Sequence, residues 1–126
     1  MNDLSKHGLN TAKYFDKNKN QIFEIFKKFQ VLEFILKLKI STKRTVDRKD
    51  LNNSFQTIAY FPLGKTINEY IREYSPNDRE KSLLKEVKKE RDMFMHLFYI
   101  YSLSVNIKEM LDATEINLDE VFKRIK

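Results

Sequence analysis

Arginine and histidine lie close together in the stretch Arg91-Asp92-Met93-Phe94-Met95-His96, within a segment whose pattern predicts a helix. A guanidinium is a permanent cation that binds anions, and a histidine exchanges protons near neutral pH. His96 is one of only two histidines in the chain. This stretch therefore points to anion binding beside a group that can transfer a proton.

Arg91 interrupts the apolar face of the helix expected over residues 78–105. From Val87 onward the apolar positions alternate at spacings of four and three, and Arg91 fills the one slot that is not apolar. A guanidinium on a core-facing position is costly unless it has anionic or hydrogen-bonding partners. Two interpretations stay open: an ion pair with a carboxylate of another helix, or the binding of a phosphate.

On a continuous helix, Asp92 precedes His96 by one turn, the spacing at which a carboxylate can bond to an imidazole. If the bond to Asp92 is the only role of His96, the histidine is structural and stiffens the fold. Arg91 and His96 would point about 140° apart around the helix, so they form no compact site within one chain.

The expected helix changes character at Met93. Beyond that point it is apolar on every side, because Met93, Leu97 and Ile100 fill the face opposite the core stripe. A helix that is apolar all round must be buried all round. These three residues therefore predict a dimer interface. Such a dimer would bring two copies of Arg91 and His96 into one cleft. Alternatively, the C-terminal helix of the same chain could cover these three residues.

The composition predicts an all-α fold, a four- to five-helix antiparallel bundle forming one domain over residues 1–126. The chain has two glycines and two prolines, a third of its residues are charged, and helix formers dominate. We expect helices over residues 2–15, 18–40, 62–74, 78–105 and 107–125, the last with an interruption near Asn117. Asn77 or Asp78 is the expected N-cap of the fourth helix. We expect residues 41–57 to form a polar connection that contains a short helical segment.

Several classes of function are excluded or disfavoured by residue counts. Without cysteine there are no disulfides, thiolate ligands or cysteine nucleophiles, and two distant histidines make a zinc site improbable. We therefore expect no metal and no cofactor. The N-terminus lacks the apolar core of a signal peptide, and the longest apolar run is too short to span a bilayer. A cytoplasmic protein with no membrane association is the expectation.

The net charge of +6 is carried entirely by the first part of the chain. Residues 1–50 contain 12 Lys/Arg against 6 Asp/Glu, whereas residues 51–126 contain 12 of each. This asymmetry suits a polyanionic partner such as RNA, although a solvated lysine face gives the same count. The predicted RNA-binding residues lie in the basic connection: Lys43, Arg44, Arg48 and Lys49.

The segment from Glu90 to Phe98 resembles the signature of HEPN domains, which are all-α bundles. That signature is an arginine, usually followed by Asn, Asp or His, and a histidine after four to six intervening residues on a long helix. Leu63-Gly64-Lys65-Thr66-Ile67 is similar to a Leu-Gly-x-Leu-Ile stretch that some bacterial relatives carry upstream at this distance.

The resemblance implies a metal-independent ribonuclease that acts as a homodimer, as in members that serve as toxins or in phage defence. His96 would transfer the proton when a ribose 2′-OH attacks the adjacent phosphate, Arg91 would bind the phosphate, and Asp92 would orient the site. An antitoxin or other protein partner is then expected.

Two other interpretations remain open. The family also has non-catalytic members, so a helical module that binds RNA or a protein partner is the alternative. A phage- or plasmid-borne regulator of a host complex fits the same sequence.

Overall fold

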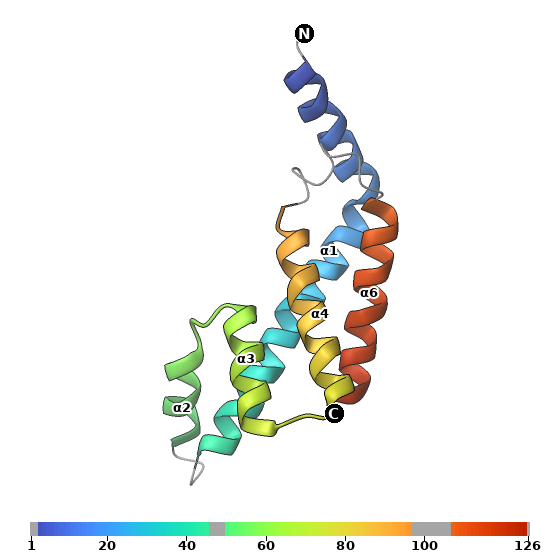
Figure 1. Ribbon diagram of the computed structural model, residues 1–126. Coiled ribbons are helices and arrows are strands. Elements are labelled where there is room, and N and C mark those ends of the chain that lie inside the picture. The colour runs from blue at the N-terminus through green and yellow to red at the C-terminus, as the bar shows by residue number, and fades with distance from the viewer. Residues whose placement is uncertain (1–2, 46–49, 97–106, 126) are drawn as a thin grey trace.

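The computed structural model describes residues 3–45, 50–96 and 107–125, and every regular element in these ranges is a helix (Figure 1). The five helices are α1 (Asp3–Arg44), α2 (Leu51–Ile58), α3 (Leu63–Tyr74), α4 (Asp78–Phe94) and α6 (Ile107–Arg124). α1 packs against α2, α3 and α6, while α4 lies between α3 and α6. The all-α class that the sequence predicts is confirmed. α4 runs opposite to α1 and α6, but the neighbouring helices α1 and α6 run in the same direction, so the prediction that the helices are all antiparallel is wrong.

The core is built on the long helix α1. Its fully buried apolar side chains recur at spacings of three and four, which places them on one face of a helix. They are Ile25, Phe29, Leu32, Leu36 and Ile40. The ring of Phe29 meets that of Phe94 at 5.6 Å between centroids, so α1 and the end of α4 share one core.

The first two helices of the sequence prediction form a single helix of 42 residues. Gly8 does not interrupt it, because one glycine costs only about 1 kcal/mol in a helix interior. α1 also extends beyond the predicted end at residue 40. Hydroxyls of its last turns bond back to the carbonyl four residues earlier, as in Ser41 Oγ to Lys37 O at 2.7 Å and Thr42 Oγ1 to Leu38 O at 2.8 Å.

α2 covers the C-terminal part of α1 and buries a lysine there. Lys37 is charged, but its side chain is only 7% exposed. Its Nζ donates to Glu33 Oε1 at 2.7 Å and to Ala59 O, just after α2, at 2.6 Å. The ammonium group therefore joins α1 to the end of α2.

The turn between α3 and α4 follows the sequence closely. α3 ends at Ser75, whose φ of 45° closes the helix in the left-handed region, and its N–H donates to Ile71 O. Asn77 is the N-cap of α4, because its side chain accepts from Glu80 N at 2.9 Å. The N-cap prediction at residues 77–78 is confirmed at Asn77.

α6 lies along both α1 and α4 without the break that was predicted near Asn117. Its buried side chains recur at spacings of three and four and face the core: Leu111, Thr114, Leu118 and Val121. Lys28 of α1 donates to Glu115 and to Asp119, each at 2.9 Å. α6 is therefore fixed to α1 by apolar packing and by a polar seam beside it.

Candidate nucleic-acid interface at the end of α4

α4 ends at Phe94, before the predicted histidine. Met95 is its C-cap and donates its N–H to Arg91 O at 3.0 Å, and His96 N donates to Met93 O at 3.0 Å. Residues 95 and 96 form a turn. The prediction of an unbroken helix through His96 is therefore wrong, and the 140° angle between Arg91 and His96 does not apply.

The polar residue of the core stripe is Glu90, and the prediction that it is Arg91 is wrong. Glu90 is 7% exposed, whereas the Arg91 side chain is 32% exposed. Both positions fit a stripe that includes Val87 and Phe94, because steps of three and four residues are equally helical. α6 decides between them by presenting the amide of Asn117, whose Nδ2 donates to Glu90 Oε1.

Glu90 is a buried acid that contacts two polar side chains of α6. Asn117 donates to its Oε1, and the buried hydroxyl of Thr114 lies beside the carboxyl group. Burial raises the pKa of Glu90, and the charge of Glu86 acts in the same direction, while the Asn117 amide opposes both. The carboxyl group therefore belongs to the core between α4 and α6 and does not face the solvent.

At the end of α4, His96 is exposed and Arg91 is half-buried. Arg91 Nη1 lies 3.4 Å from Oδ1 of the adjacent Asp92, whose side chain is 59% exposed. His96 is exposed, and no bond joins it to Asp92 in this part of the structure. The predicted Asp92–His96 contact is therefore replaced by a weak Asp92–Arg91 pair. The C-terminal end of a helix favours cations, which suits both groups.

A lysine-lined groove leads to this end of α4. It has a volume of about 440 Å³ and lies between α3 and α4. Its lining residues are Asn68, Lys85, Lys88, Lys89, Asp92 and Met93. The three lysines and Asp92 recur at steps of one, three and four residues, so they share one side of α4.

The groove lysines carry unpaired charge. Lys85 and Lys89 are exposed and Lys88 is half-buried. Within residues 3–45, 50–96 and 107–125, none of the three forms an ion pair or hydrogen bond. Three free ammonium groups beside Arg91 form a surface that attracts polyanions.

Gly64 allows Lys88 to lie close to α3. A Cβ at this position would come within 2.9 Å of Lys88 Cε. The glycine of the Leu63–Ile67 stretch thus makes room for a groove lysine. The spacing of the three lysines with Asp92 along the sequence is the signal that could have identified the groove.

The predicted RNA-binding residues of the basic connection divide into two pairs. Arg44 Nη2 donates to Glu69 Oε2 at 2.6 Å and its Nε to Glu73 Oε1 at 2.9 Å. Lys43 donates to Glu73 O and lies 4.5 Å from the centre of the Tyr74 ring. Both side chains therefore connect α1 to α3. Arg48 and Lys49 lie outside the described residues.

The predicted dimer interface is only partly within the described chain. Met93 is half-buried, packs against the core and also lines the lysine groove. Leu97 and Ile100 lie outside the described residues. Met93 is thus partly used within one subunit, and a dimer through this region stays a prediction.

No cluster of three metal-ligating side chains occurs among the described residues, and no helix in those ranges is long and apolar enough to cross a membrane. No protein-family model, curated protein or solved structure matches the chain.

Proposed function

We propose that this chain is a HEPN-like, metal-independent endoribonuclease that acts as a homodimer, in the manner of relatives that serve as toxins or in phage defence. The lysine groove would hold the backbone of single-stranded RNA, and Arg91 would bind the scissile phosphate. Asp92, which pairs with Arg91, would orient the guanidinium.

In the proposed reaction His96 is the proton acceptor. The ribose 2′ oxygen forms a bond to phosphorus while the bond from phosphorus to the 5′ oxygen breaks. The neutral imidazole takes the 2′ proton, and the departing 5′ oxygen takes a proton from solvent. The products are a 2′,3′-cyclic phosphate and a free 5′-hydroxyl. Arg91 stabilises the charge that develops on the phosphoryl oxygens.

One observation carries the proposal: the unpaired lysines along α4 lead to a half-buried arginine, whose partner is the adjacent Asp92, and to an exposed histidine. Lys85, Lys88 and Lys89 provide sequence-independent attraction for phosphates. Arg91 and His96 follow these lysines at the end of α4. Cleavage of a bound RNA needs both kinds of group at the same phosphate.

The proposal is tested with purified protein and single-stranded RNA in the presence of EDTA. We expect the wild type to cut the RNA and to leave 2′,3′-cyclic phosphate ends. His96→Ala should lower the cleavage rate at least about 100-fold, the range that a general base contributes, while RNA binding and the helical circular dichroism stay unchanged.

The control variant is Tyr60→Ala, because Tyr60 is 95% exposed and is not among the residues that line the lysine groove. It should cut like the wild type. Retained cleavage by His96→Ala would move the catalytic group elsewhere, and intact RNA with the wild type would remove the enzymatic part of the proposal.

The second candidate is a non-catalytic helical module that binds RNA or a protein partner such as an antitoxin. It is favoured by the surroundings of His96, because no described side chain hydrogen bonds to the imidazole and fixes its ring. A general base works best when it is held in position. In this case the wild type and His96→Ala bind RNA equally and neither cuts it.

A further inference from the structure

α1 has a second apolar face that the fold leaves open. Five large side chains point away from the buried stripe and are between 39% and 62% exposed: Phe23, Phe26, Val31, Phe34 and Leu38. They span 15 residue steps of one helix, or about 22 Å. The three phenylalanines alone expose roughly 300 Å² if a free ring presents about 200 Å². The largest apolar patch of a typical monomer exposes about 300–600 Å² and is often functional, so this face is a candidate interaction surface.

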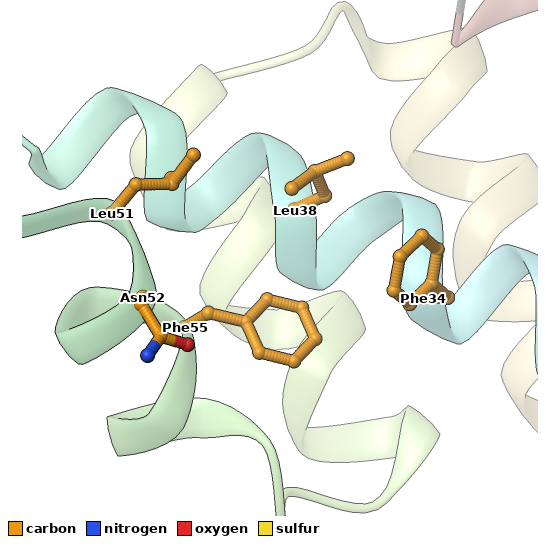
Figure 2. Close-up of a pocket in the computed structure, with 5 residues that line it drawn as sticks. All are labelled: Phe34, Leu38, Leu51, Asn52 and Phe55. Carbon is orange, nitrogen blue, oxygen red and sulfur yellow. The ribbon is translucent and has the colours of Figure 1, made fainter. Parts of the chain in front are cut away.

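The C-terminal end of this α1 patch opens into a groove. Phe34 and Leu38 of α1 face Leu51, Asn52 and Phe55 of α2 across a hollow of about 360 Å³ (Figure 2). Figure 2 shows the Phe55 ring reaching from α2 toward Phe34, and the two ring centroids are 5.8 Å apart. The walls are almost wholly apolar, so the groove suits an aromatic side chain.

The N-terminal end of the α1 patch protrudes, which complements the groove at its C-terminal end. Phe23 and Phe26 are 62% and 45% exposed and have no covering element among the described residues. They lie about eight to fifteen residues before the groove wall, on the same side of the same helix. A protruding end and a hollow end on one face are self-complementary under a two-fold rotation.

We infer that the α1 patch binds a second copy of this chain, with the two α1 helices antiparallel and the two-fold axis near Gln30. This arrangement inserts Phe23 and Phe26 of each copy into the groove of the other. Gln30 meets its own counterpart at the axis.

The apolar area of the α1 patch is sufficient for an interface with a second copy of the chain. Two copies would bury more than about 600 Å² of phenylalanine surface, with Val31 and Leu38 adding to it. A specific interface of about 1,200 Å², of which somewhat more than half is apolar, needs a similar amount. The α1 patch lies on a different helix from the lysine groove and from Met93. The inference rests on the homodimer of the proposed function and places its interface on α1 instead of at Met93, Leu97 and Ile100, whereas RNA cleavage is tested separately.

Cysteine cross-linking of the full chain tests the position of the axis, because the native sequence has no cysteine. Gln30→Cys should form a disulfide-linked dimer under mild oxidation. Ile116→Cys, at a 68% exposed site on α6, is the matched control and should stay monomeric on a non-reducing gel. Equal cross-linking of both variants, or none with Gln30→Cys, would overturn the arrangement.

Sedimentation at micromolar concentration tests the interface itself. The wild type should show twice the 15.2 kDa of one chain. Phe23→Glu should lower the mass to that of the monomer with unchanged circular dichroism, since Phe23 is outside the core, and Ile116→Glu should remain dimeric. A monomeric wild type means that another segment or partner covers the patch, and a Phe23→Glu dimer means that the interface lies elsewhere; either result contradicts the inference.

Discussion

Glu90 shows how one residue decides which face of a helix is buried. Its carboxyl group sits between α4 and α6 with the Asn117 amide as its hydrogen-bond donor. Arg91, one position later, is thereby turned toward solvent. The exposure of the arginine that the proposed chemistry needs thus depends on the burial of its acidic neighbour.

The raised pKa of Glu90 predicts a specific dependence of stability on pH. Because burial makes the folded-state pKa higher than the ordinary 4.5, ionisation of Glu90 favours the unfolded state. The free energy of unfolding should therefore fall as the pH rises above 4.5 and through the folded-state pKa. Glu90→Gln, which can still accept from Asn117, should lack this loss.

Urea unfolding at several pH values measures the effect. The variant should match the wild type at pH 4 and gain relative stability toward neutral pH. The exposed Glu24→Gln is the matched control and should follow the wild type at each pH. If the Glu90 and Glu24 variants show the same pH dependence, the carboxyl of Glu90 is not desolvated.

At the residue scale, the sequence predicted the features that depend on local patterns, such as a helix cap and buried apolar positions. The cap at Asn77 and the burial of Val87 and Phe94 follow from local hydrogen bonding and periodicity, and the structure confirms them. The choice between Glu90 and Arg91 could not be predicted, because it depends on which groups α6 presents. That information lies 27 residues away in the chain.

At the scale of elements, α1 is the scaffold to which the other helices attach. Its core face receives α3 and α6, and its C-terminal part receives α2. The sequence of α1 alone does not mark Lys37 as buried, because the segment that covers it, at the end of α2, lies 22 residues later in the chain. Lys37 is buried by a tertiary contact between α1 and α2, which the helical periodicity of α1 cannot predict.

Replacement of Lys37 should loosen α2. Lys37→Met keeps the buried volume but leaves Glu33 and the carbonyl of Ala59 without their donor. We expect a loss of about 1–3 kcal/mol in the free energy of unfolding, the usual cost of an unsatisfied buried polar group. Chemical denaturation followed by circular dichroism measures it.

Lys27→Met is the matched control, because Lys27 pairs with Glu24 on the exposed surface of the same helix. Its cost should stay below about 1 kcal/mol. Equal losses in the two variants would mean that the Lys37 ammonium contributes no more than a surface charge.

At the scale of the whole molecule, the position of charge matters more than its sum. The surplus of basic residues lies in the first 50 positions, yet Arg44 is paired with carboxylates and Lys43 with a backbone carbonyl and a ring. The unpaired cations that line a groove lie in the electrically neutral remainder, on α4. Charge counting along the sequence could not find this surface, because pairing is decided by the fold.

The measurement that tests the lysine groove most directly is the salt dependence of single-stranded RNA binding. We compare the wild type with the triple variant Lys85→Ala, Lys88→Ala and Lys89→Ala. If the three ammonium groups contact phosphates, the slope of log K against log salt should become shallower by about 2, since each contact contributes roughly 0.7.

The matched control removes three exposed lysines of α1, in Lys13→Ala, Lys17→Ala and Lys19→Ala, and so changes the net charge equally. It should leave the slope close to that of the wild type. A slope that stays unchanged in the groove variant, or one that falls equally in both variants, would contradict the assignment of the α4 groove as the RNA-binding surface.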